Sequence, residues 1–179
     1  MSKPGYSGLT VLLHWVVAIA ILFLFGISWW MMAIPYGEYR YLPFQLHKNL
    51  GMTLIALGLV LLIARFFPRP GALPPSTPRW MRRAAVADHV LMYLLIFVVC
   101  LSGMLSSAFS GWGTVLWWQV VLIPDEAARR WENEWLNTLF SDVHIYSSWI
   151  LLALLITHVA GAVFHAFRRD GVARRMLRL

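Results

Sequence analysis

Four apolar runs, each about as long as a membrane-spanning helix, divide the chain. They cover residues 9–33, 46–65, 88–109 and 142–167, and few charged side chains interrupt them. A helix needs roughly 20 apolar residues to cross the hydrocarbon core of a bilayer. The pattern therefore predicts an all-α membrane protein, a bundle of four transmembrane helices.

The segment between the third and fourth runs has a different pattern. In DEAARRWENEWLNTLFSD, residues 125–142, the apolar Trp131, Trp135, Leu136 and Leu139 recur at helical spacing with acids and arginines between them. This pattern is typical of a short amphipathic helix that lies at a membrane interface. Charges on such a helix usually form a solvated face rather than a binding site.

Composition supports the membrane class. Of the 179 residues, 60% are hydrophobic and 13% are charged, and the mean hydropathy is +0.66, which is well above the range of soluble domains. Cys100 is the single cysteine, so an intrachain disulfide and a C-x-x-C-H haem attachment are excluded. Any redox cofactor must be held without thiols.

The charges predict an orientation. The net charge is +7, and in an up-and-down topology most basic residues fall at the end that carries both termini and the loop of residues 65–88. The positive-inside rule places this end in the cytoplasm, and so one-sided a distribution argues against nucleic acid as a partner. The basic residues of this end are Lys3, Arg65, Arg69, Arg79, Arg82, Arg83, Arg168, Arg169, Arg174, Arg175 and Arg178, whereas Arg40, Lys48, Arg129 and Arg130 lie at the other end among six acids.

All six histidines lie within the apolar runs. Histidine is rare in membrane spans and normally faces the bundle interior with a partner. His144 and His158 are fourteen residues apart, so they lie within about 40° of one helix face and about 21 Å apart along the axis. The fourth run therefore presents two imidazoles to the bundle at two depths.

Two further histidines lie at matching depths on other helices. His14 is in the first run, level with His158, and His47 is at the start of the second, level with His144. Neutral imidazole suits iron, and a histidine pair would fill both axial positions of a haem iron. The sequence thus predicts two bis-histidine haem sites, whereas the alternative for any single histidine is a hydrogen bond to Ser, Thr or a backbone carbonyl.

Two glycines follow these histidines by about one helical turn. Gly51 follows His47 and Gly161 follows His158. A glycine at these positions would let a flat macrocycle approach the backbone, although helix packing in membranes also favours small residues.

Four motifs carry a resemblance to a known family. LTVLLHW, QLHKNLG, ADHVLMYLLIFVVCLSGML and VHIYSSWILLALLITHVAGAVFHAF resemble the bacterial cytochrome b561 family over nearly the whole chain. The resemblance implies a single cytochrome b561 domain over residues 1–179 in the bacterial inner membrane, with two non-covalent b-type haems. It also implies ubiquinone as an electron acceptor and the axial iron ligands His14 and His158 on the cytoplasmic side and His47 and His144 on the periplasmic side.

Within this family, the chain resembles the superoxide oxidase type in its length, its four spans and its lack of an attached domain. This resemblance implies an oxidoreductase that oxidises superoxide at the periplasmic haem and reduces ubiquinone near the cytoplasmic haem. A positive charge beside the outer haem would concentrate the superoxide anion, and Lys48 is the candidate, with Arg129 and Arg130 as helpers. The alternative for Lys48 is a snorkelling interfacial lysine or a haem propionate partner.

His89 and His165 lie nearer the inner pair and are the candidates for a quinone site. Histidine can hydrogen-bond a quinone carbonyl and transfer protons near neutral pH. The alternatives are two interfacial histidines that face water or lipid headgroups, or a cap of the third helix formed by Asp88 and His89.

Two other functions stay open. A cytochrome b membrane subunit would pass electrons between a partner dehydrogenase or hydrogenase and quinone, and would co-purify with that redox partner protein. A haem-free metal-binding membrane protein would use the histidines to bind or move an ion. The sequence shows no intramembrane carboxylate to accompany them, and ion pathways often use one.

Overall fold

Four long helices dominate the computed structural model, which describes residues 6–35, 37–64 and 73–177, with the backbone alone for Glu38. Each is long and apolar enough to cross a membrane. The predicted all-α bundle with four transmembrane helices is therefore confirmed. The long helices are α1 (Gly8–Ala33), α2 (Glu38–Ala64), α3 (Arg79–Phe109) and α5 (Glu134–Phe167), and the shorter elements are β1 (Thr114–Leu116), β2 (Val120–Ile123), α4 (Asp125–Trp131) and the 3₁₀ helix η1 (Ala173–Met176).

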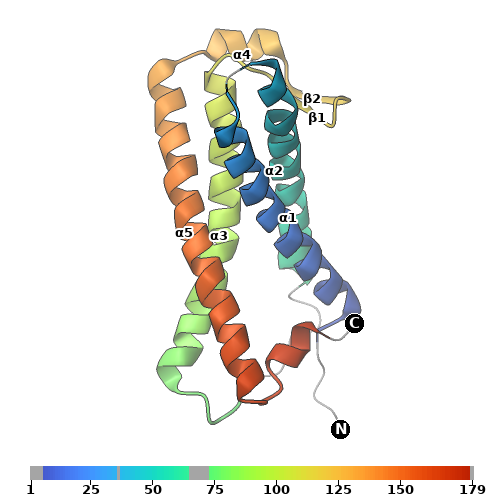
Figure 1. Ribbon diagram of the computed structural model, residues 1–179, viewed down its shortest axis with the longest axis vertical. Helices are drawn as coiled ribbons and strands as arrows, with labels where there is room; N and C mark the ends of the chain where they lie inside the picture. Colours follow the sequence, from blue (N-terminus) through green and yellow to red (C-terminus); the bar gives the residue numbers. More distant parts are fainter. Residues whose placement is uncertain (1–5, 36, 65–72, 178–179) are drawn as a thin grey trace.

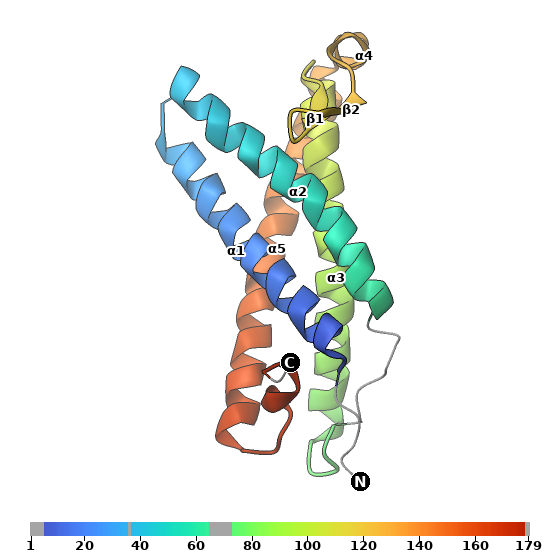
Figure 2. The ribbon, with the colours of Figure 1, turned by 90° about the vertical axis from the view of Figure 1, so that its right-hand side faces the viewer.

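The helices pack as two crossed pairs. Helix α3 runs along α5 and α1 along α2, and α2 also contacts α3; Figure 2 shows the two pairs crossing at an angle. Both ends of the chain lie at one end of the bundle, which we call the terminal end, whereas the hairpin and α4 lie at the other, the hairpin end (Figure 1). Between the ends is an apolar core to which all four helices contribute, made of Val17, Ile21, Leu54, Leu61, Ile96, Cys100 and Leu151.

Three helices begin earlier than the apolar runs predicted. Helix α2 starts at Glu38 rather than residue 46, α3 at Arg79 rather than 88, and α5 at Glu134 rather than 142. Pro43 lies inside α2, where it removes one N–H near the helix start and so costs a single intrahelical bond. Hydrophobicity marks only the part of a helix that matches the bilayer core, so polar first turns escape the prediction.

The amphipathic segment is split between two helices. Helix α4 has only seven residues, and Trp135, Leu136 and Leu139 belong to the first turns of α5. The side chain of Asn133 accepts a hydrogen bond from the Leu136 amide at 3.0 Å, which caps α5 and makes the chain turn there. A short helix is therefore present in the predicted segment, but it ends at Trp131, and its place at a membrane interface stays a prediction.

A β-hairpin, which the sequence analysis did not predict, packs against α2 at the hairpin end. Strands β1 and β2 are antiparallel, and the turn holds Trp117 and Trp118 at φ of 47° and 59°. The Trp117 amide donates to Asn49 Oδ1 at 2.6 Å, and its indole N–H donates to Thr53 Oγ1 at 3.0 Å. These two bonds fix an unusual turn onto the side of a transmembrane helix.

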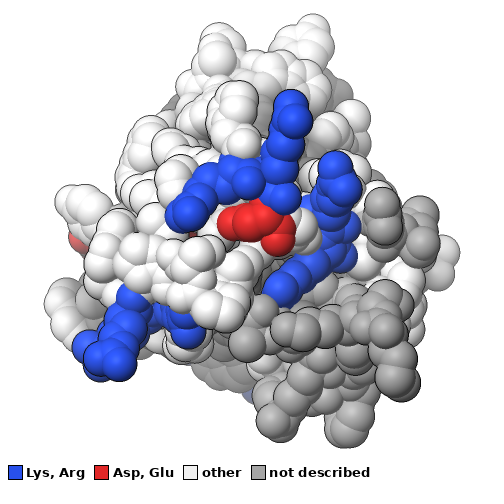
Figure 3. All heavy atoms as spheres, turned by 90° about the horizontal axis from the view of Figure 1, so that it is seen from below, with Lys and Arg blue, Asp and Glu red and all other residues white. Residues whose placement is uncertain are grey.

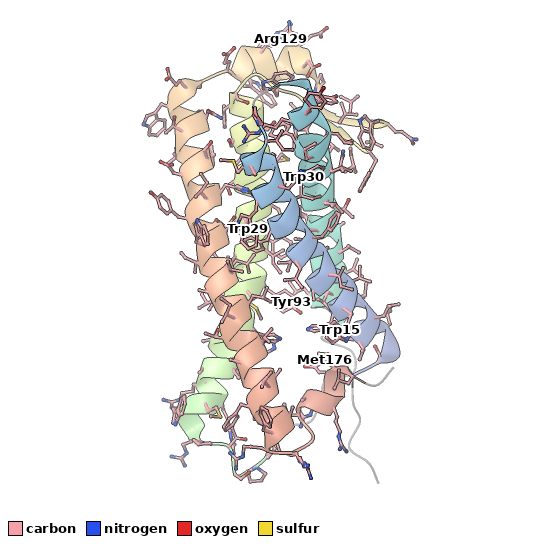
Figure 4. All side chains as sticks on the ribbon, viewed as in Figure 1. Trp15, Trp29, Trp30, Tyr93, Arg129 and Met176 are labelled. Carbon is pink, nitrogen blue, oxygen red and sulfur yellow. The ribbon has the colours of Figure 1, made fainter. Side chains whose placement is uncertain are left out.

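The chain reverses direction after α5. Arg169 and Gly171 have φ of 50° and 83°, and the Val172 amide donates to Asp170 Oδ1 at 3.1 Å. As a result η1 folds back toward α1, where Trp15 and Met176 meet (Figure 4).

Basic side chains gather at the terminal end. Seen from below, Lys and Arg side chains surround a small acidic patch (Figure 3). This placement agrees with the charge asymmetry deduced from the sequence. The described basic residues of this end are Arg79, Arg82, Arg83, Arg168, Arg169, Arg174 and Arg175, while Lys3, Arg65, Arg69 and Arg178 lie outside the described residues.

Candidate functional site

Two histidine pairs lie on opposite sides of the apolar core. The ring centroids of His14 and His158 are 6.2 Å apart, and those of His47 and His144 are 6.0 Å apart. The first pair joins α1 to α5 near the terminal end, and the second joins α2 to α5 near the hairpin end. The structure thus brings together the histidines that the sequence placed at equal depths.

The ring separations fit a metal ion between the imidazoles. A metal–imidazole nitrogen bond is about 2 Å long, so two rings on opposite sides of one ion have centroids roughly 6 Å apart. Nδ1 of His14 and Nδ1 of His47 are buried and have no hydrogen-bond partner among the described residues. A buried polar atom is normally paired, so each pair contains one ring nitrogen whose hydrogen-bonding capacity the described residues do not use.

Space beside the pairs also suits a flat group. A Cβ built on Gly51 or on Gly161 would meet no described atom within 4 Å. Both faces are therefore open next to a histidine, as a macrocycle against the backbone requires. The donor set of two neutral imidazoles is the one that b-type haem uses in electron-transfer proteins.

Gly103 on α3, which the sequence analysis missed, makes room for His144. A Cβ at this position would lie 2.8 Å from Nδ1 of His144, closer than non-bonded atoms can approach. Nδ1 of His144 lies 2.8 Å from the carbonyl oxygen of Val99, to which it donates in the tautomer that leaves Nε2 free as a ligand. The glycine looked like any small residue of a membrane helix, because its partner is distant in sequence.

Asp88, considered in the sequence only as a helix cap, contacts the inner pair. Its carboxylate lies 3.3 Å from Nδ1 of His158 and accepts a hydrogen bond from Thr157 Oγ1 at 2.9 Å. Because α3 begins at Arg79, Asp88 and His89 are interior helix residues and the capping alternative is wrong. The sequence analysis saw no intramembrane carboxylate to accompany the histidines, and it did not predict this contact between Asp88 and His158.

His89 belongs to the same cluster. Its ring centroid is 5.0 Å from that of His158, and its Nδ1 lies 2.6 Å from the Ala85 carbonyl oxygen. Ligand atoms of Asp88, His89 and His158 lie within 4.8 Å of one another, close enough to share a small ion. The haem-free alternative therefore has a candidate metal site. The ring centroids of His89 and His158, 5.0 Å apart, are closer than the roughly 6 Å expected for two imidazoles on opposite sides of one ion.

His165, the second quinone candidate, has a different setting. It is buried at the end of α5, and its Nδ1 lies 2.6 Å from Asp170 Oδ2. It borders a cavity of about 160 Å³ that Arg169, Arg174 and Leu177 also line. The alternative of a water-exposed histidine does not hold for this residue.

Lys48 lies beside the outer pair and is anchored by neutral groups. Its ammonium donates to Ser107 Oγ at 2.7 Å and to the Gly113 carbonyl at 2.8 Å. Among the described residues, no carboxylate oxygen lies within the 4.0 Å of an ion pair with it. Its positive charge is thus held in place at the hairpin end, where the carboxylate of Asp125 is near enough to interact with it electrostatically.

The two arginine candidates lie farther out, on α4. Arg129 and Arg130 are exposed, and Arg129 lies at the tip of the molecule (Figure 4). Arg129 lines a recess of about 290 Å³ together with Asp125 and Glu132. The two acids reduce the positive potential there.

Known proteins with similar sequences agree with this architecture. The model of a family described as prokaryotic cytochrome b561 matches residues 5–179. The chain belongs to the prokaryotic cytochrome b561 family. Members of this family transfer electrons in the membrane and bind b-type haem, so the chain is a multi-pass bacterial membrane protein with oxidoreductase-type electron transfer.

Three relatives match this cytochrome b561 chain over almost its full length. Cytochrome b561 homolog 2 of Escherichia coli K12 is 30% identical over 179 residues, covering 96% of this chain and 90% of the relative. Cytochrome b561 homolog 1 of the same organism is 24% identical, with 96% of each chain covered. Cytochrome b562 of Cereibacter sphaeroides is 26% identical, with 98% of this chain and 97% of the relative covered.

Proposed function

We propose that this cytochrome b561 is a di-haem superoxide oxidase that passes electrons from superoxide to ubiquinone. The observation that carries the proposal is the presence of two histidine pairs, with ring separations of 6.2 and 6.0 Å, on opposite sides of the apolar core. His47 and His144 would hold one b-type haem, and His14 and His158 the other. When bound, each haem would supply one-electron redox chemistry.

The proposed orientation follows from the charges. The described arginines of the terminal end favour the cytoplasmic side of the inner membrane, with both chain ends there and the hairpin end in the periplasm. Superoxide would then react at the outer pair, and ubiquinone at the inner pair.

Lys48 supports superoxide as the donor. A fixed positive charge raises the local concentration of a small anion and its encounter rate. The overall reaction takes one electron from each of two superoxide anions, releases two dioxygen molecules and, with two protons, converts one ubiquinone into ubiquinol. Arg129 and Arg130 are the proposed helpers farther out, where Asp125 and Glu132 beside Arg129 partly offset their charge.

His89 and His165 are the proposed quinone residues. Quinone reduction needs groups that hydrogen-bond the carbonyl oxygens and deliver protons, and imidazole does both near neutral pH. His89 contacts the inner pair directly, and His165 borders the cavity between α5 and η1. Both are at the end from which cytoplasmic protons would enter.

The test is anaerobic stopped-flow mixing of the oxidised protein with potassium superoxide, with and without a short-chain ubiquinone. The expected result is rapid reduction seen in the haem absorption bands, followed by reoxidation only when quinone is present. A bis-histidine spectrum that superoxide leaves unchanged would refute superoxide as the donor and favour the partner-subunit function. A colourless protein with stoichiometric zinc would favour the haem-free alternative at Asp88, His89 and His158.

Substitution of Lys48 tests the electrostatic part of the proposal. Lys48→Met removes the charge but keeps an apolar stem, and we expect the second-order rate constant with superoxide to fall about tenfold at low salt. Lys48→Arg should retain most of the rate. Arg83→Gln removes an equal charge at the terminal end and serves as the control; an equal loss in this variant would contradict a local role for Lys48.

A further inference from the structure

The inner histidine pair differs from the outer pair in the group behind one of its rings. Nδ1 of His158 faces the carboxylate of Asp88 at 3.3 Å, whereas Nδ1 of His144 faces the neutral Val99 carbonyl at 2.8 Å. Both acceptors lie on α3 and both histidines on α5. The two sites therefore have the same ligand type but backing groups of different charge.

A carboxylate changes the chemistry of the ring that it accepts from. The Nδ1–H group of a neutral imidazole donates a hydrogen bond to the carboxylate, and this tautomer leaves the Nε2 lone pair free for a metal. An anionic acceptor also makes the ring more basic and hence a better electron donor to the metal. A neutral peptide carbonyl fixes the same tautomer but raises the basicity of the ring less than a carboxylate does.

Asp88 is held so that it can act in this way. The Thr157 hydroxyl lies 2.9 Å from Oδ1 of Asp88 and 2.8 Å from the Leu154 carbonyl oxygen, so these two acceptors share its one proton, and His158 faces Oδ2. Among the described residues, no Lys or Arg nitrogen forms an ion pair with this carboxylate. Its side chain is 15% exposed, and a partly buried charge acts more strongly than one in water.

We propose that Asp88 is a positioning residue that fixes the tautomer of His158 and lowers the reduction potential of the inner site relative to what a neutral acceptor would give. The inference rests on the proposed ligation of haem by His14 and His158. A more electron-donating ligand stabilises the oxidised iron, so the inner end becomes the stronger reductant. It is the end at which the electron is proposed to leave for quinone.

The experiment is a spectroelectrochemical titration of the purified, haem-loaded protein. Asp88→Asn keeps the size of the side chain and removes its charge. We expect the ratio of reduced to oxidised inner haem at a fixed potential to rise about tenfold, which for a one-electron couple is a shift of about +59 mV. The reduction potential of the outer haem should shift by much less, because the acceptor behind His144, the Val99 carbonyl, is unchanged.

Asp170→Asn is the matched control. Asp170 also accepts from a histidine, His165, at 2.6 Å at the same end of the bundle, but that histidine is not a proposed ligand. Equal shifts in the two variants would overturn the inference, because they would show a general charge effect. An unchanged inner potential in Asp88→Asn would overturn it as well.

A second variant covers loss of the cofactor. If Asp88→Asn does not retain the inner haem, Asp88→Ser, which keeps a neutral acceptor, is titrated instead and should show the same positive shift. Loss of haem from both variants would overturn the inference, because Asp88 would then be required for binding rather than for tuning. A wild-type protein without haem at this pair would refute the proposed function itself, whereas two intact haems indifferent to Asp88 would refute only the inference.

Discussion

The indole N–H of Trp15 donates a hydrogen bond to the carbonyl oxygen of Met176, 2.7 Å away and 161 residues later in the chain. This bond fastens η1 to α1 beside His14, the neighbour of Trp15. The C-terminal segment therefore bridges from α5 to α1 at the end of the bundle that holds the inner pair.

Replacement of Trp15 by phenylalanine should release η1 without unfolding the bundle. The lost bond is partly exposed, so we expect a cost of about 0.5–1.5 kcal/mol. Hydrogen–deuterium exchange should become faster in residues 173–177 and stay unchanged in the long helices. Trp29→Phe, the same substitution higher on α1, is the control, and equal protection of η1 in both variants would contradict the bridge.

The ligand assignment predicts haem content. His144→Ala and His158→Ala should each lose one of the two proposed haems, measured as pyridine haemochrome per chain, because each removes one proposed iron ligand. His165→Ala should retain both. Circular dichroism must show equal helix content in all three variants; full haem content in either ligand variant would refute that assignment.

Gly103→Ala should disturb the outer pair selectively. Its methyl group would lie 2.8 Å from Nδ1 of His144, and overpacking of this kind costs about 1–3 kcal/mol. We expect loss or spectral perturbation of the outer haem with the inner haem retained. Gly58→Ala, whose Cβ would meet Ile96 and Phe97 at ordinary distances of 3.6 and 3.7 Å, should bind haem normally.

The His165–Asp170 contact predicts an acid-sensitive chain reversal. Burial raises the pKa of Asp170, but hydrogen bonds from His165 and the Val172 amide and the charge of Arg168 lower it more, so its pKa is below the ordinary 3.8. A lowered carboxyl pKa stabilises the fold above the unfolded-state pKa, and this contribution is lost as the pH falls through the folded-state value. Amide exchange in residues 169–176, referenced to the core helices, should rise below about pH 4, whereas Asp170→Asn should show raised exchange already at neutral pH and no further step.

The sequence predicted the histidine placement because helix periodicity and up-and-down topology determine depth and face together. Rings 6.2 and 6.0 Å apart agree with the pairing of His14 with His158 and of His47 with His144, and their role as ligands stays a prediction. The depth of each histidine and the helix face that it occupies follow from helix periodicity, the rise per residue and the order of the spans.

The sequence did not predict the groups behind those rings. Asp88 and Gly103 reach their histidines across the packed surfaces of α3 and α5, and no periodicity in one helix reports on the neighbour that it faces. The hairpin was missed for a related reason. The residues that anchor it, Asn49 and Thr53, lie far away in sequence. In addition, Trp117 and Trp118 adopt positive φ angles, which tryptophan seldom takes.

One continuous helix supplies a histidine to each pair. Because His144 and His158 both belong to α5, about 21 Å of covalently continuous helix separates them, and tilting α1 or α2 changes neither their spacing nor their shared face. A single inserted residue between them would turn one ring by about 100°, away from its partner. An insertion of about four residues, one turn, would change the angle between the rings by only about 40°, so both would stay on one face, and it would lengthen the gap by about 6 Å. The spacing of the two pairs along α5 can thus change in steps of about one helical turn, but not by a single residue.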